Sequence, residues 1–200
     1  MSQNLADSIR RALISSRDEM AAFVSDPSTV DVIEKMAGIL AECFRAGNKV
    51  LSCGNGGSAC DAVHFAEEFT GRYKHDRKAL PVIPLLDSAH LTCVANDYGY
   101  EFIFSRGVEA YGKPGDVLLA ITTSGRSPNV INAVNAARAA GMKVLLLTGK
   151  DGGLLAGTCD AEILVKSHAT ERIQEVHMST LHVLIEAVER ILFPENWAGQ

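Results

Sequence analysis

The chain has 200 residues, of which 47% are hydrophobic and 22% are charged, and its formal net charge is −5 at pH 7. A chain of this length and apolar content can bury a sizeable core, which argues against disorder, and the acidic balance without a basic stripe argues against binding to nucleic acid or anionic membrane. No apolar run approaches the roughly 18 residues of a membrane span, and the N-terminus has no signal-peptide pattern, so we expect a cytoplasmic protein.

The cysteines are odd in number and scattered without a CxxC pair: Cys43, Cys53, Cys60, Cys93 and Cys159. This pattern fits reduced thiols rather than a disulfide framework or a cysteine-rich zinc site. We interpret most of them as small buried hydrophobic residues.

Helical patterns fill the N-terminal part, residues 1–47. Apolar residues from Leu5 to Phe23 recur at helical spacing and predict an amphipathic helix, which Pro27 ends. A second helix is predicted over residues 30–44, with Gly47 as its C-terminal stop. The first helix is not needed to complete an alternating core. We therefore expect its apolar face to pack against other subunits, with packing inside its own subunit as the alternative.

From residue 48 onward, extended and helical patterns alternate. Short apolar runs typical of buried parallel strands predict strands over residues 49–53, 81–86, 116–121, 143–148 and 161–165. Helices are predicted after a glycine-rich turn at 53–61, in two pieces over 87–111, over 128–140 and over 170–193. Pro81 and Pro84 leave the pairing of the second strand open. We expect the tail, residues 194–200, to be frayed.

This alternation indicates a doubly wound α/β sheet over residues 48–193, within a single domain of residues 1–200. In such folds, ligands bind beyond the carboxyl ends of the strands. The glycine-rich turn and a serine-rich loop at residues 122–129 both follow predicted strands. Both segments are therefore expected at this edge of the sheet.

The first candidate site is the pentapeptide HFAEE, residues 64–68, directly after the turn CGNGGSACD. His64 and Glu68 are four residues apart on the predicted helix, so the imidazole and the carboxylate leave the same face. Glu67 is rotated about 60° the other way from His64 and is the alternative carboxylate. Backbone amides at a strand-to-helix turn bind anions, but the glycines match neither GxGxxG nor a P-loop, so a nucleotide cofactor has little support.

The second candidate is TTSGRSPN, which follows the apolar run DVLLAI. A helix is predicted to begin here, with Pro128 at an early position. The hydroxyls of the segment and the free amides at the start of this helix predict an uncharged binding site for a phosphate. Simple capping of that helix by Ser127 is the alternative.

The third candidate is RIQEVHMSTLH, on the last predicted helix. Gln174 and His182 are eight residues apart, about 80° around the helix, so both can meet one ligand. His177 lies comparably close to Gln174 on the other side, so helical geometry does not choose between the two histidines. A lone histidine in an apolar helix is more often a core or surface residue than a ligand.

These motifs carry a resemblance. SCGNGGSACDAVHFAEEFTGRY, the pair Asn96-Asp97, TTSGRSPNV, LTGKDGG and RIQEVHMSTLH together resemble the sedoheptulose 7-phosphate isomerases, or phosphoheptose isomerases, of the sugar-isomerase (SIS) domain superfamily. The similarity spans about residues 30–193. It implies a three-layer α/β/α sandwich around a five-stranded parallel sheet, preceded by N-terminal helices. It also implies a homotetramer with active sites at subunit contacts, one zinc ion per subunit, and an aldose–ketose isomerisation that starts the synthesis of lipopolysaccharide heptose.

The resemblance also assigns roles to individual residues. The metal ligands of the family match His64, Glu68, Gln174 and His182, and its catalytic pair matches Glu68 and His182. Substrate contacts match Asn55, Gly56, Gly57, Ser58, Glu68, Arg72, Asn96, Asp97, Thr122, Thr123, Ser124, Ser127 and Gln174. Thr122 stands where the family more often has Ser, and it keeps the hydroxyl.

Two other classes of protein remain as alternatives to an isomerase. The tail LFPENWAGQ is similar to the related replication-initiator-associating proteins, which are non-catalytic adaptors of the same fold. Those adaptors lack the acid and base that match Glu68 and His182, and this chain has both. A sugar-phosphate-sensing regulator would normally carry a DNA-binding domain, for which the chain has no room.

The implied reaction needs what these residues supply. Moving a carbonyl from C2 to C1 requires a base that takes a proton from C1, and Glu68 fits this role. It also requires a group that moves protons between the two oxygens, and His182 fits that role. Zinc would polarise the carbonyl or the enediolate as a Lewis acid. Because ligation occupies the lone pairs that both residues need for proton transfer, the ion can be catalytic, structural or inhibitory.

Overall fold

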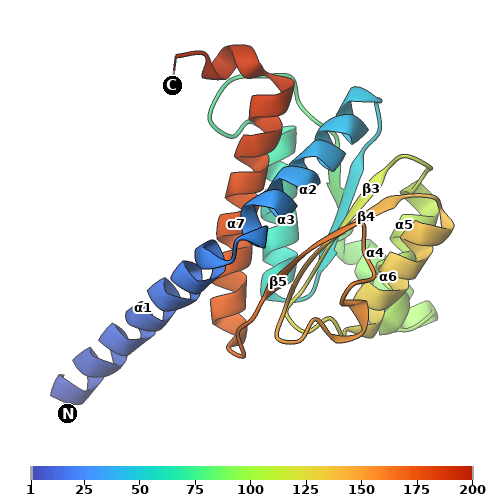
Figure 1. The fold of residues 1–200 in the computed structure, drawn as a ribbon. Helices are drawn as coiled ribbons and strands as arrows, with labels where there is room; N and C mark the ends of the chain where they lie inside the picture. Colours follow the sequence, from blue (N-terminus) through green and yellow to red (C-terminus); the bar gives the residue numbers. More distant parts are fainter. Residues whose placement is uncertain (1, 200) are drawn as a thin grey trace.

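A parallel β-sheet between two layers of helices forms the fold (Figure 1). The computed structural model describes the backbone of residues 2–199 and the side chains of residues 4–199. Within this range the five strands lie in the order β2-β1-β3-β4-β5 and are all parallel. They are β1 (Val50–Gly54), β2 (Val82–Pro84), β3 (Val117–Thr122), β4 (Lys143–Gly149) and β5 (Ala161–Val165). The predicted fold class is therefore confirmed, and no strand boundary differs from the expected one by more than two residues.

The prolines explain the place of β2. This strand is short, lies at the edge of the sheet, and pairs with β1 in the register Val50↔Val82 to Ser52↔Pro84. Proline cannot donate a ladder hydrogen bond, so it is tolerated at an edge and not in the centre. The central strands β1 and β3, in contrast, are buried along their whole length.

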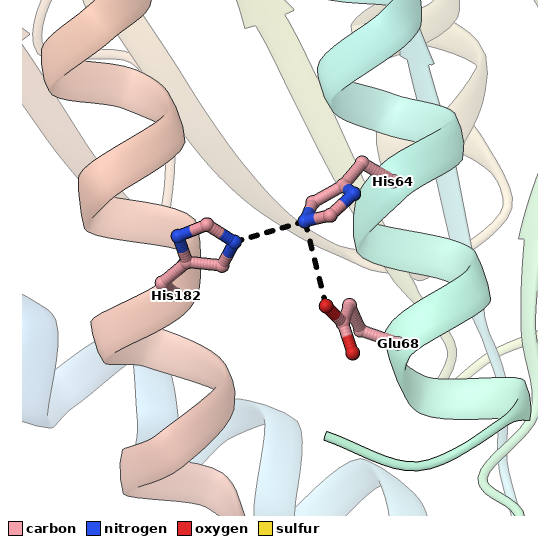
Figure 2. Close-up of side chains that lie close together, drawn as sticks. All are labelled: His64, Glu68 and His182. Atoms are coloured by element: carbon pink, nitrogen blue, oxygen red, sulfur yellow. Dashed lines mark hydrogen bonds and ion pairs between the residues drawn. The ribbon is translucent and has the colours of Figure 1, made fainter. Parts of the chain in front are cut away.

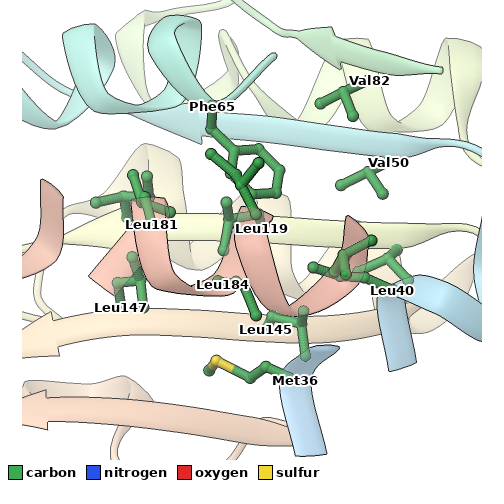
Figure 3. Close-up of a cluster of buried hydrophobic side chains, with 14 of the residues drawn as sticks. Met36, Leu40, Val50, Phe65, Val82, Leu119, Leu145, Leu147, Leu181 and Leu184 are labelled. Atoms are coloured by element: carbon green, nitrogen blue, oxygen red, sulfur yellow. The ribbon is translucent and has the colours of Figure 1, made fainter. Parts of the chain in front are cut away.

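Two helical layers cover the two faces of the sheet. On one face lie α2 (Ser28–Arg45), α3 (Gly57–Thr70) and α7 (Thr170–Leu192), and Figure 3 shows their apolar side chains meeting those of the strands. On the other face lie α4 (Ser88–Asp97), α5 (Ser105–Tyr111) and α6 (Pro128–Ala139). Successive strand residues pack against opposite helical layers. Leu119 and Leu145 pack against the first layer, and Leu118 and Leu146 pack against the second. The described residues also form three short 3₁₀ helices: η1 (Tyr100–Phe102), η2 (Gly153–Leu155) and η3 (Pro194–Trp197).

The first helix, α1 (Ser2–Ser25), projects away from the rest of the molecule (Figure 1). Only its last turns pack on the core, through Met20 and Phe23. Leu5, Ile9 and Leu13 are 54–68% exposed. The apolar face that the sequence predicts is thus largely uncovered within one subunit. No helix of the described residues has both the length and the apolarity to cross a membrane.

Two sequence expectations were wrong. The tail is not frayed at residues 194–197, because η3 folds back and buries Trp197, whose ring lies 4.0 Å from the guanidinium carbon of Arg190. The interpretation of the cysteines as buried holds for Cys43 and Cys53 and fails for Cys60 and Cys93, which are exposed. Both errors concern tertiary packing, which local pattern does not report.

Candidate active site

Two helices meet to form the central cluster of polar side chains. α3 supplies His64 and Glu68, α7 supplies His182, and the three side chains point toward one another (Figure 2). His64 Nε2 lies 2.9 Å from His182 Nε2 and 3.5 Å from a Glu68 carboxylate oxygen. Their ligand atoms all lie within 4.8 Å of one another. This spacing suits one small ligand or one metal ion, and the two ring nitrogens are about as far apart as neighbouring ligands of a tetrahedral zinc.

The structure distinguishes the two neighbouring glutamates. Glu67 reaches the other ring nitrogen of His64, Nδ1, at 3.3 Å, and its side chain is 61% exposed. Glu68 lies on the inner side of the helix, where its side chain is only 16% exposed. The helical rotation that favours Glu68 in the sequence is thus the arrangement found.

The two histidines of α7 have different surroundings. His177 is fully buried, and its Nε2 donates to the backbone carbonyl of Thr148 at 3.0 Å. Burial lowers the pKa of His177 to about 4. His177 is therefore a neutral core residue, and only His182 reaches the cluster.

An aromatic ring that the sequence did not single out covers His182. Tyr73 stacks on His182 with ring centroids 5.9 Å apart and an interplanar angle of 17°. Partial burial raises the pKa of the Tyr73 phenol. Tyr73 lies in the irregular segment between α3 and β2, where no periodicity predicts the direction of a side chain. A surface hollow of about 450 Å³, lined by His64, Cys60 and Leu86 among others, lies beside α3.

The glycine-rich turn brings Gln174 to the beginning of α3. A Cβ on Gly57 would overlap the side-chain amide of Gln174, so a larger residue at position 57 would displace that amide from its present place. Gly56 has φ +55°, a conformation that favours glycine. Ser58, the next residue, is buried in the first turn of α3.

A pair of asparagines joins this turn to the serine-rich loop. Asn55 and Asn129 exchange two amide hydrogen bonds of 2.8 and 2.9 Å, and the hydroxyl of Tyr100 donates to Asn55 Oδ1 at 3.0 Å. Asn129 is 1% exposed. The sequence suggested Asn55 as a substrate contact, but it suggested neither Asn129 nor Tyr100. The pair fixes the ends of β1 and β3 relative to each other.

Most side-chain hydroxyls of the serine-rich loop are accessible to a ligand. Thr122 is buried, whereas Thr123, Ser124 and Ser127 are partly exposed. Ser127 occupies the N-cap position of α6 but makes no side-chain capping bond, which disfavours the alternative of simple capping. Ser124 Oγ accepts a 3.3 Å bond from the amide of Arg126.

Three predicted substrate contacts lie apart from the cluster. Arg72 is exposed just after α3, and Asn96 and Asp97 are exposed at the end of α4, where Asn96 donates to Asp97 at 2.8 Å. Within the described residues, no hydrogen bond or ion pair connects these three to His64, Glu68 or His182.

Asp61 is a further acidic residue beside the site. It lies on α3 one turn before His64, is 5% exposed, and has one carboxylate oxygen without a hydrogen-bond partner. Burial raises the pKa of Asp61 to about 6. The sequence did not single out Asp61, because its burial depends on the elements that pack against α3.

Comparison with known proteins identifies the family. Residues 17–149 match the SIS domain model. The phosphoheptose isomerase of Photorhabdus laumondii is 56% identical over 185 residues, which cover 92% of this chain and 96% of that protein. Solved phosphoheptose isomerases from Neisseria gonorrhoeae and Francisella tularensis, both 36% identical, superpose with TM-scores of 0.82 and 0.84 and cover 94% and 95% of this chain and 99% of each of theirs. The chain therefore belongs to the phosphoheptose isomerase family of SIS-domain proteins.

Proposed function

We propose that this chain interconverts sedoheptulose 7-phosphate and D-glycero-D-manno-heptose 7-phosphate, an early step toward the ADP-heptose of lipopolysaccharide. The observation that carries the proposal is the meeting of His64 and Glu68 on α3 with His182 on α7, in a chain that is 56% identical to a phosphoheptose isomerase. A carboxylate and an imidazole in one half-buried cluster are the acid–base groups that an aldose–ketose isomerisation needs.

Glu68 acts as the base at carbon. Its carboxylate takes a proton from C1 of the ketose, which leaves an enediolate, and the same proton returns at C2 as the aldehyde forms at C1. A side chain only 16% exposed is partly protected from water, and this favours the return of the proton to the sugar over its exchange with solvent.

His182 moves protons between the two oxygens. Its Nε2, which faces the cluster, takes the proton of the O1 hydroxyl and delivers it to O2, so the ring is protonated in between and neutral again afterwards. The stacked ring of Tyr73 limits the rotation of His182, which keeps Nε2 directed toward His64 and the bound sugar.

The phosphate is bound by the serine-rich loop. Ser124, Ser127 and the free amides at the start of α6 form a neutral cradle at the carboxyl end of β3. Asn55 and Asn129 hold this cradle next to the glycine-rich turn, which approaches the sugar. Binding energy at the phosphate thereby orients carbons several bonds away.

We also propose that a zinc ion binds at the cluster. His64, Glu68 and His182 offer three ligand atoms within 4.8 Å, and the oxygen of Gln174 is the proposed fourth ligand. Nitrogen and carboxylate oxygen are donors that zinc accepts. When bound, the ion would supply Lewis-acid polarisation of a substrate oxygen, and it would occupy lone pairs that Glu68 and His182 use in proton transfer.

We further propose a homotetramer in the cytoplasm, with active sites at subunit contacts. The exposed apolar residues of α1, which include Leu5, Ile9 and Leu13, support association, because such a face is stabilised by burial. Cys60 and Cys93, which are exposed free thiols, fit a reducing compartment.

The decisive experiment measures the aldose product formed from sedoheptulose 7-phosphate by the purified protein, with metal analysis of the same sample. Glu68→Gln and His182→Ala should each lower the rate at least about a hundredfold, the usual effect of losing a general acid or base. Glu67→Gln is the matched control, because Glu67 carries the same group on the exposed side of the helix. Near-normal rates in both site variants would contradict the proposed roles.

A further inference from the structure

A charged side chain outside the cluster is buried beneath the end of α3. Arg77 lies in the segment between α3 and β2, and its side chain is 1% exposed. Its guanidinium donates five hydrogen bonds, and four of them go to backbone carbonyls. A guanidinium this deeply buried must have such partners, because an unpaired charge in the interior is costly.

Three of the carbonyls belong to the end of α3. Nη2 donates to the carbonyl oxygen of Glu68 at 2.7 Å, and Nη1 donates to those of Phe69 at 2.7 Å and Gly71 at 3.1 Å. The last carbonyls of a helix have no partners within the helix and carry its negative dipole end. Arg77 therefore caps α3 at the residue that provides the proposed catalytic carboxylate.

The fifth hydrogen bond connects this cap to α7. Arg77 Nε donates to Glu189 Oε1 at 2.7 Å, and the Glu189 side chain is also 1% exposed. Glu189 follows His182 by seven residues, which is two turns and nearly the same face of the helix. The ion pair thus joins the end of α3 that carries Glu68 to the face of α7 that carries His182, and the two helices lie side by side around the cluster (Figure 2).

Stability alone does not account for this pair. A buried ion pair can often be replaced by apolar residues without loss of stability, and Glu189 Oε2 has no hydrogen-bond partner. An apolar contact tolerates sliding and rotation of one helix against the other. A guanidinium with five directed bonds fixes both the height and the rotation of the last turn of α3.

We propose that Arg77 and Glu189 are positioning residues, which hold Glu68 and His182 at the relative placement that proton transfer requires. The proposal rests on the isomerase function proposed above. Neither residue touches the sugar; they act through the backbone of Glu68 and through α7. A displacement of about 1 Å at a reacting group can lower the rate about a hundredfold. A small shift of α3 against α7 is therefore sufficient to reduce turnover.

The test compares two conservative variants, Arg77→Lys and Glu189→Gln. Lysine keeps the charge but not the fork of donors, and glutamine keeps an acceptor but not the charge. Both should lower kcat at least about tenfold with KM within about threefold of wild type, since the phosphate cradle and the glycine-rich turn are unchanged. The matched control is Lys49→Met, which breaks another largely buried ion pair, with Asp116, at the amino ends of β1 and β3. It should lose stability and keep its kcat.

Rates are compared at a temperature at which circular dichroism shows every variant folded. The double variant Arg77→Met/Glu189→Met replaces the pair by an apolar contact and is expected to fold with a low kcat. A wild-type kcat in either conservative variant or in the double variant would overturn the positioning role. So would a loss of kcat in Lys49→Met as large as that in Arg77→Lys. An inactive wild-type protein would instead overturn the proposed function, and the positioning role with it.

Discussion

Acid should destabilise this protein through one histidine. His177 lies in the core on α7, fully buried, with Nε2 donating to the carbonyl of Thr148 and Nδ1 without a partner. Protonation would place a charge and an unpaired N–H in the core. Burial therefore lowers the pKa of His177 to about 4, from 6.5 in the unfolded chain.

The direction and size of the change in folding stability with pH follow from this difference in pKa. Above pH 6.5 both states hold a neutral imidazole, and His177 has no effect on the pH dependence. As the pH falls toward 4, the unfolded chain binds the proton first, so folding stability decreases. A pKa difference of about 2.5, at about 1.4 kcal/mol for each unit, gives a loss of about 3 kcal/mol near pH 4.

The matched variant is His177→Gln, whose amide can donate to Thr148 and does not titrate. The free energy of unfolding is measured by urea titration at pH 7.5 and pH 4.5, at one protein concentration for both proteins. Between these two values wild type should lose about 2 to 3 kcal/mol more than the variant. Asp61, whose pKa burial raises to about 6, contributes in the opposite sense, since its cost falls as the pH drops, but it is present in both proteins and cancels.

A difference in unfolding free energy between wild type and His177→Gln that is the same at pH 7.5 and pH 4.5 would refute this reasoning. It would mean that His177 is protonated as easily in the folded protein as in the unfolded chain. The interpretation of His177 as a neutral core residue would then fail.

Three further predictions concern the substrate, the first helix and the tail. Sedoheptulose without its phosphate should lose turnover as well as affinity, and Ser124→Ala should raise KM for the phosphorylated sugar about tenfold; equal turnover of both sugars would exclude the loop from phosphate binding. Deletion of residues 1–26 should reduce both the tetrameric mass seen by light scattering and the activity, whereas a fully active monomer would contradict the role of α1. Trp197→Ala should lower the free energy of unfolding by about 3 kcal/mol in urea titrations, and an unchanged value would show that the tail does not stabilise the fold.

The order and type of the elements could be predicted from the sequence because these depend on local periodicity. The continuous apolar runs of β3 and β4 are readable without knowledge of their neighbours, since a strand buried on both faces needs an apolar residue at almost every position. The relation of His64 to Glu68 is equally local, because four residues on a helix fix their common face, and the same rotation separates Glu67. Two of the three residues of the central cluster were therefore determined within a single helix.

The rest of the site depends on contacts between segments far apart in the chain. His64 and His182 are separated by 118 positions, and only the packing of α7 on the sheet directs His182 to the cluster and His177 into the core. Tyr73 and Arg77 come from an irregular segment in which no repeat predicts where a side chain points. The burial of Trp197 depends on Arg190, which α7 places beneath the returning tail. Periodicity reports which face of an element is apolar, whereas the partner that covers this face is decided by tertiary packing.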